Sequence, residues 1–457
     1  MGKCSGTDGF RGEAGIDLTA DHAYKVGRFL GWYYNMLRER NGNNEPARIV
    51  IGKDTRRSSY MFEYSLDAGL TASGADAYLL HVTTTPSVAY IARVDDFDCG
   101  IMISASHNPY YDNGIKLIDC YGEKMPEETL LLVEDYIDGK LHVFDKDWPE
   151  LPFAHREHIG CTVDYVAGRN RYMGYLISLG IYSFKGIKVG LDCANGASWN
   201  IAKSVFDALG ADTYVINNQP NGLNINLNAG STHIEGLQKF VVEKGLDVGF
   251  AYDGDADRCL AVDERGRVVD GDQILYVCGV YLNKHGRLSG GTVVPTIASN
   301  FGLVKSLELA GLSAVTSGVG DRHVYAKMRK GGYSLGGEQT GHTIFGDIER
   351  TGDGIMTSLR VMEVIRAERE TLSQLTAPCK LLPQAQVAVH VADKDAALEN
   401  MGVQNAIAEA EAALAGEGRV LVRKSGTESV IRVLAEAPDQ ASADAAMKRI
   451  ANALEAL

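Results

Sequence analysis

The amino-acid sequence predicts an α/β protein of several domains, and three observations support this. Its 457 residues exceed what one hydrophobic core usually covers, so about three or four domains are expected. Short apolar runs typical of strands alternate with helical patterns in three successive units, which favours three similar mixed-sheet α/β domains. After Pro378 and Pro383 the strands are shorter and the helices rich in Ala and Glu, which favours a smaller C-terminal α+β domain.

The first unit contains two strong strand patterns and one clear helix. Residues 48–52 and 99–103 are apolar runs that predict buried strands. Residues 61–73 predict a helix that ends at Gly74, because glycine is the residue expected just past a helix end. Residues 145–158, rich in proline, charge and histidine, predict a break after this unit.

The later units repeat the alternation without obvious self-similarity of sequence. The second unit predicts strands at 188–192 and 247–252 and helices at 199–209 and 235–244. The third predicts strands at 292–295 and 313–316 and helices at 302–310 and 322–330. The last predicts strands at 386–391, 419–422 and 430–435 and helices at 395–415 and 441–457. We therefore expect four domains, at residues 1–157, 158–258, 259–376 and 377–457.

Composition excludes several classes of protein. The net charge of −14 argues against a surface for nucleic acid or for an anionic membrane. The eight cysteines lie far apart without a C-x-x-C pair, which indicates reduced thiols and no zinc or disulfide framework. No apolar run approaches the roughly 20 residues that span a bilayer, and the N-terminus lacks the apolar region of a signal peptide. We expect a soluble cytoplasmic protein.

The most informative segment is Ser-Ala-Ser-His-Asn-Pro at residues 104–109, directly after the predicted strand at 99–103. It presents the hydroxyl of Ser106 on a loop at a strand end, where catalytic groups concentrate. The alternative is a turn that merely closes the strand. A serine hydrolase is disfavoured, because the G-x-S-x-G motif is absent around Ser106.

A second segment, Asp-Gly-Asp-Ala-Asp-Arg at residues 253–258, follows another predicted strand. In an extended segment Asp253, Asp255 and Asp257 would point to one side, and such crowded carboxylates suit Mg²⁺. The alternative is a solvated acidic turn. An EF-hand is excluded, because Arg258 occupies the sixth position, where that loop needs glycine.

Two further loops offer polar groups, and the N-terminus offers a third. Glu338, Thr340 and His342 lie in a glycine-rich segment that suits the hydroxyls of a sugar, although a plain turn explains it equally well. The segment 423–427, Arg-Lys-Ser-Gly-Thr, predicts a site for an anion, with a basic hairpin tip as the alternative. Arg11 lies in a glycine-rich segment at residues 5–12, which could also be a flexible start.

Together these motifs resemble the α-D-phosphohexomutase superfamily nearly from end to end. The matching segments, in order, are 5–12, 104–109, 253–258, 337–342 and 423–427. Residues 222–226, residues 230–233 and the pair Glu338-Gln339 resemble the glucosamine branch of that superfamily. The resemblance implies four domains around a central cleft, the first three alike.

The resemblance also assigns roles. Ser106 would be the phosphoserine that donates phosphate to the sugar and recovers it, and its phosphate would share Mg²⁺ with the three aspartates. Proton transfer would fall to Lys116 or His342. The groups around the transferring phosphoryl group would be Arg11, His107 and Lys116; those on the sugar hydroxyls Glu338 and Thr340; and those on the other phosphate Arg423, Ser425, Gly426 and Thr427.

The implied reaction interconverts glucosamine 6-phosphate and glucosamine 1-phosphate through glucosamine 1,6-bisphosphate. The alternatives are a glucose or mannose phosphomutase of broad specificity, a phosphatase, or a silent binder of sugar phosphates. The partner would be a small sugar phosphate, and a homodimer is an assembly that the sequence leaves open. Thr340, Ser429 and Ala229 stand where the superfamily usually has Ser, Pro and Cys, so the sugar preference stays open.

Overall fold

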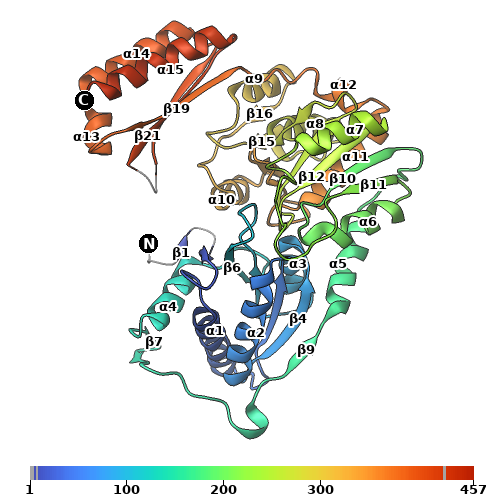
Figure 1. Cartoon of the computed structure of the whole chain (residues 1–457), viewed down its shortest axis with the longest axis vertical. Coiled ribbons are helices and arrows are strands. Elements are labelled where there is room, and N and C mark those ends of the chain that lie inside the picture. Colours follow the sequence, from blue (N-terminus) through green and yellow to red (C-terminus); the bar gives the residue numbers. More distant parts are fainter. Residues whose placement is uncertain (1–4, 7–8, 426–428) are drawn as a thin grey trace.

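The computed structural model describes residues 5–6, 9–425 and 429–457. Figure 1 shows three α/β bodies and a fourth, set apart, in which helices cover one face of a small sheet. The first three sheets combine parallel and antiparallel pairs, whereas the fourth is antiparallel throughout. This confirms the predicted fold class. No helix in the described part of the chain is both long and apolar enough to cross a bilayer.

The first domain is built on a seven-stranded sheet of order β1-β2-β6-β5-β3-β4-β9. Its strands are β1 (Ser5–Gly6), β2 (Gly9–Glu13), β3 (Arg48–Lys53), β4 (Asp76–Val82), β5 (Cys99–Ile103), β6 (Asp112–Asp119) and β9 (Thr162–Asp164). Its helices are α1 (Ala20–Arg40), α2 (Arg57–Ala72), α3 (Thr85–Val94) and α4 (Glu127–Ile137), and β7 (His142–Val143) with β8 (Lys146–Asp147) forms a small hairpin. The central strands β3 and β5 are parallel and buried on both faces, which explains their continuous apolar sequence.

The second domain has a five-stranded sheet of order β11-β10-β12-β13-β14. Its strands are β10 (Lys188–Asp192), β11 (Asp212–Ile216), β12 (Val248–Tyr252), β13 (Cys259–Asp263) and β14 (Val268–Val269), and its helices α5 (Val166–Ser178), α6 (Ala202–Ala208) and α7 (Glu235–Lys244). The predicted helix at 199–209 is interrupted, because a 3₁₀ turn over Ala197–Asn200 precedes α6.

The third domain has the sheet order β16-β15-β17-β18. Its strands are β15 (Thr292–Val294), β16 (Ser313–Ala314), β17 (Leu335–Gly337) and β18 (Thr343–Phe345). Its helices are α8 (Gly271–Lys284), α9 (Phe301–Leu309), α10 (Asp321–Gly331), α11 (Gly354–Glu368) and α12 (Leu372–Thr376). The second and third domains share one continuous apolar core, whereas the first and the fourth have cores of their own.

The fourth domain has the antiparallel sheet order β19-β21-β20. It consists of β19 (Gln384–His390), β20 (Arg419–Lys424), β21 (Val430–Glu436), α13 (Lys394–Glu399), α14 (Met401–Leu414) and α15 (Gln440–Glu455). The single helix predicted at 395–415 is wrong, because Asn400 is extended (φ −63°, ψ 128°) and its side chain caps α14.

The domain boundaries at 157, 258 and 376 stay predictions. Strand β9 follows the first of them and pairs with β4 of the first sheet, and β13 and β14 follow the second and belong to the second sheet. The β12–β13 turn and the loop after β5 both lie where domains meet, and this brings their side chains together.

Candidate active site

The hydroxyl of Ser106 lies just beyond the carboxyl end of β5, as the sequence predicts. The residue is buried and has a left-handed backbone (φ 54°), a conformation that few residues other than glycine adopt. Its N–H donates to Ser104 Oγ (2.9 Å), and its own Oγ donates to Asp253 Oδ2 (2.5 Å). His107 Nδ1 lies 3.5 Å from Ser106 Oγ. Burial and the charges of nearby arginines lower the pKa of His107, so its ring is neutral at pH 7.

The three aspartates lie on the turn between β12 and β13. The expectation of an extended segment is wrong, because the chain turns at Asp253 and Ala256 has a left-handed backbone (φ 56°). The turn nevertheless brings the three carboxylates within 4.8 Å of one another, all buried. Burial and the neighbouring carboxylates raise the pKa of Asp253 well above its ordinary value.

This cluster fits a divalent cation. The Oδ1 atoms of Asp255 and Asp257 are buried and have no hydrogen-bond partner among the described residues, although a buried carboxylate oxygen normally has one. Three clustered carboxylates also repel one another unless positive charge is nearby. Hard oxygen ligands suit magnesium or calcium, and the arrangement leaves room for ligands that the chain does not supply.

Lys116, on β6, supplies part of that positive charge. Its Nζ lies 2.5 Å from Asp255 Oδ2 and 3.4 Å from Asp257 Oδ2. Burial alone would lower the pKa of Lys116, but these two carboxylates raise it above its ordinary value, so the amine is cationic. Burial likewise favours a high pKa for Asp257, but the charges of Lys116 and Arg258 hold it well below its ordinary range.

The predicted sugar loop forms the turn between β17 and β18. Glu338 is half-buried and accepts a hydrogen bond from the backbone N–H of Gly320 (2.8 Å), while Thr340 is exposed. His342 is buried, and its Nε2 lies between the N–H of Gly352 (3.0 Å) and a carboxylate oxygen of Asp321 (3.5 Å). The shorter contact needs an unprotonated Nε2, which places the ring proton on Nδ1.

A cavity of about 290 Å³ brings the predicted groups of three domains together. The predicted residues that line it are Arg11, Ser106, Lys116, Asp257, Glu338, Thr340 and His342. Asp253 and His107 touch Ser106 from outside this lining. Sequence reasoning missed Lys124, Arg258, Asp321 and Arg322, which also line the cavity.

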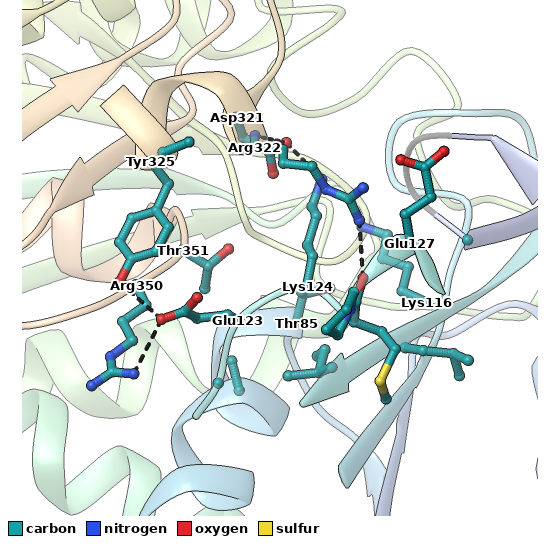
Figure 2. Close-up of a pocket in the computed structure, with 18 of the residues that line it drawn as sticks. Thr85, Lys116, Glu123, Lys124, Glu127, Asp321, Arg322, Tyr325, Arg350 and Thr351 are labelled. Atoms are coloured by element: carbon teal, nitrogen blue, oxygen red, sulfur yellow. Dashed lines mark hydrogen bonds and ion pairs between the residues drawn. The ribbon is translucent and has the colours of Figure 1, made fainter. Parts of the chain in front are cut away.

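A second cavity, of about 560 Å³, adjoins the first and shares Lys116, Asp257 and three of the missed residues with it (Figure 2). The ion pair between Lys124 Nζ and Asp321 Oδ1 (2.6 Å) joins the first domain to the third at this border. Figure 2 also shows Glu123 accepting from Arg350 (3.2 Å). These contacts hold the β6–α4 loop against α10 and against the segment after β18, so the border between the cavities is built from both domains.

The predicted phosphate loop is at the end of the β20–β21 hairpin. Arg423 stands directly opposite Arg432 across the two strands, and both are exposed. Two cations so close together attract an anion. Lys394 Nζ donates to the backbone oxygen of Ser425 (2.8 Å), a cation that sequence reasoning missed. Gly426 and Thr427 lie outside the described residues, and the described hairpin residues line neither cavity.

Fold and site define an enzyme that handles phosphorylated sugars, and comparison with known families agrees. The descriptions that match are "Phosphoglucomutase/phosphomannomutase, alpha/beta/alpha" domains I, II and III and the C-terminal domain of the same family. They match residues 2–142, 171–266, 270–381 and 387–453. The chain therefore belongs to the α-D-phosphohexomutase superfamily of isomerases, as the motifs predicted.

Two relatives that match nearly the whole chain share one name. A protein of Lachnospira eligens named phosphoglucosamine mutase is 61% identical over 437 residues, which cover 96% of this chain and 95% of that protein. One of Anoxybacillus flavithermus with the same name is 46% identical over 451 residues, covering 99% and 98% of the two chains.

Solved structures share the fold at lower identity. A phosphoglucomutase/phosphomannomutase family protein of Burkholderia thailandensis is 22% identical, with a TM-score of 0.78 over 98% of this chain and 96% of that one. N-acetylphosphoglucosamine mutase of Aspergillus fumigatus, solved with GlcNAc-6P and magnesium, is 19% identical, with a TM-score of 0.68 over 98% and 95%.

Proposed function

We propose that this enzyme interconverts glucosamine 6-phosphate and glucosamine 1-phosphate, with glucosamine 1,6-bisphosphate as the intermediate. One observation carries the proposal: the hydroxyl of Ser106 donates to Asp253 within a buried carboxylate cluster, at the wall of a cavity that three domains build. The names of the relatives at 44–61% identity supply the sugar.

The chemistry begins with a phosphate carried by Ser106. The phosphorus leaves Ser106 Oγ for the free hydroxyl of the bound hexose phosphate, so that one O–P bond breaks and one forms. The sugar hydroxyl loses a proton and Ser106 Oγ ends with one. The bisphosphate then turns over in the cleft and returns its other phosphate to Ser106. Such transfer depends on positioning and charge neutralisation more than on covalent steps.

Each predicted residue has a task in this scheme. Asp253, Asp255 and Asp257 would hold Mg²⁺ together with the Ser106 phosphate, and the ion would neutralise charge on the transferring phosphoryl oxygens. Arg11, His107 and the cationic Lys116 would surround the same group, since Arg11 and Lys116 line the cavity and His107 lies beside Ser106. Lys116 and His342 stay our candidates for proton transfer.

The sugar and its second phosphate are held further out. Glu338 and Thr340 face the cavity from the third domain and would bind sugar hydroxyls. Arg423, Ser425, Gly426 and Thr427 would grip the phosphate that is not transferred, and the opposed pair Arg423 and Arg432 favours an anion there.

A cytoplasmic location completes the proposal, because the seven described cysteines are all unpaired, which suits a reducing compartment.

A coupled assay with the 6-phosphates of glucosamine, glucose and mannose tests the proposal. We expect the highest kcat/KM with the glucosamine compound. A higher value with glucose or mannose phosphate would replace the proposal by a phosphohexomutase of broad specificity. Release of inorganic phosphate without isomerisation would indicate a phosphatase.

A further inference from the structure

The backbone of Ser106 is held from two domains at once. Its carbonyl oxygen accepts from Arg56 Nη2 (3.2 Å), which belongs to the first domain, and from Asn226 Nδ2 (2.8 Å), which belongs to the second. The carbonyl oxygen of Asn108 accepts from the same two groups, at 2.6 Å and 3.0 Å. One amide of the second domain therefore bridges two carbonyls on either side of His107.

Asn226 is itself fixed. It lies in the loop between β11 and α7, is 6% exposed, and has a left-handed backbone (φ 60°), which asparagine tolerates better than most residues. Its N–H donates to the carbonyl of Ala194, just past β10 (2.9 Å). The side-chain amide is thus presented to the serine loop from an anchored backbone.

The carbonyl of Ser106 is also closed in by the carboxylate turn. A Cβ at Gly254 would stand 2.4 Å from that oxygen, so the two segments approach this closely only because residue 254 is glycine. In return, the first domain holds the turn, because Thr85 Oγ1 donates to a carboxylate oxygen of Asp255. The nucleophile and the carboxylates are therefore positioned by exchanged contacts across one interface.

We propose that Asn226 is a positioning residue, whose amide keeps the left-handed Ser106 aligned with the carboxylate cluster during phosphoryl transfer. This inference rests on the proposed function. A left-handed non-glycine backbone is disfavoured unless its surroundings hold it. Arg56 holds the loop to its own domain. From the second domain, Asn226 holds the carbonyl oxygens of the loop backbone, whereas Asp253 accepts from the Ser106 hydroxyl that reacts.

The test compares Asn226→Gly with Asn228→Gly. Glycine suits the left-handed backbone at both positions (φ 60° and 49°), so each change removes a side chain without backbone strain. Asn228 is exposed and serves as the matched control. Asn226→Asp is a second variant of the same shape, in which a carboxylate replaces the donor and faces two carbonyl oxygens. Thermal unfolding checks that each variant folds.

We expect kcat of Asn226→Gly to fall by about tenfold or more, because small misplacements of reacting groups cost rates of that order, and kcat of Asn226→Asp to fall further. KM for the sugar phosphate should stay within about twofold, because sugar and distal phosphate are held elsewhere. Release of inorganic phosphate per isomerisation should rise, since a loosely held phosphoserine is open to water. Asn228→Gly should match the wild type in all three.

Equal kcat and equal phosphate release in the two glycine variants would overturn the inference. The inference would also be overturned if kcat fell only in proportion to the amount of competent enzyme. Intact mass measures that amount as the fraction of chains in which Ser106 accepts phosphate. If Asn226→Gly does not fold, Asn226→Asp decides by the same criteria. Failure of the proposed function is visible separately, because wild-type enzyme would then not isomerise glucosamine phosphate, while the comparison of variants runs on whichever hexose phosphate it does isomerise.

Discussion

The two regions that we propose to hold the substrate are built in different ways. At the serine loop, Ser106 and Asp253 are buried and meet across a domain interface. At the β20–β21 hairpin, Arg423 and Lys424 are exposed, and the fourth domain has a core of its own. Bond-making needs atoms fixed in advance, whereas an anion can be gripped by mobile cations. In the proposed reaction, the end that transfers phosphate is thus fixed by buried contacts, and the end that holds the other phosphate is exposed.

The largest expected effect comes from the reacting hydroxyl. Ser106→Ala should fold but lose nearly all mutase activity, because among the described residues no other hydroxyl donates to Asp253. Initial rates in the coupled assay measure this. Ser104→Ala is the control, since Ser104 Oγ accepts from the N–H of Ser106 and from Arg56 Nη1 rather than donating to Asp253. Activity retained in Ser106→Ala and lost in Ser104→Ala would show that Ser104, and not Ser106, is the nucleophile.

Removal of the metal should be nearly as severe. A chelator should abolish activity and added Mg²⁺ should restore it, because in the described part of the chain Asp255 and Asp257 carry buried carboxylate oxygens without hydrogen-bond partners. Asp255→Asn should raise the Mg²⁺ concentration needed for half-maximal rescue. Full activity in metal-free buffer would show that no metal takes part in catalysis at the serine loop.

The hairpin should show a smaller and more uniform effect. Arg423→Ala should lower kcat/KM for all three hexose phosphates alike, by roughly 2 kcal/mol for a lost charge-assisted contact. Substitutions at Gln339 or Thr340 should instead change the ratio between glucosamine and glucose phosphates. A matrix of efficiencies, three sugars against these variants, separates the two. A changed sugar preference in Arg423→Ala would show that the hairpin reads more than the phosphate.

The smallest expected effect concerns the contact between Glu349 of the third domain and Arg93 of the first. Glu349 is buried, 3.3 Å from Arg93 of the first domain, and burial raises its pKa to about 7. Because its pKa is raised, Glu349 binds a proton more tightly in the folded protein than in the unfolded chain. The stability that this proton contributes is present below the ordinary pKa and is lost as the pH rises to about 7.

Residue 349 cannot ionise in Glu349→Gln, so the free energy of unfolding of this variant should fall less than that of the wild type between pH 5 and pH 7. The two slopes should differ by at most about 1.4 kcal/mol per pH unit. Calorimetry over that range measures it. Asp353, with a pKa raised to about 6 by burial, stays in both proteins and leaves a residual slope. Parallel curves for the two proteins would mean that Glu349 is ionised in the folded state.

The sequence predicted the elements best where the local pattern was strong. Strands β5 and β10 and helix α7 have the predicted bounds, because buried parallel strands and a helix ended by Gly245 leave clear local signals. The helix break at Asn400 was missed, although asparagine at that point is a helix-start signal. The superfamily was also predicted, because its motifs are local segments in a fixed order.

The site was predicted only in its local parts. Ser106 and the three aspartates lie in short motifs, and the structure brings them together. Thr85 and Asp321 carry no such signal, since their importance comes from contacts with residues 170 and 197 positions away in the chain. Asn226 lies in the motif at residues 222–226, but its hydrogen bond to Ser106, 120 positions away, could not be predicted from that motif. The turn at Asp253 was mistaken for an extended segment, because the left-handed Ala256 cannot be read from the sequence.

Strand β9 has a consequence for synthesis of the chain. It pairs in parallel with β4 and is the outermost strand of the seven-stranded sheet, although it is the last of them in the sequence. Until residue 164 has left the ribosome, the nascent first domain therefore presents the polar backbone edge of β4 to other chains. A fragment that stops at residue 157 keeps that edge open, so it should self-associate, whereas one that extends past β9 should stay monomeric at the same concentration.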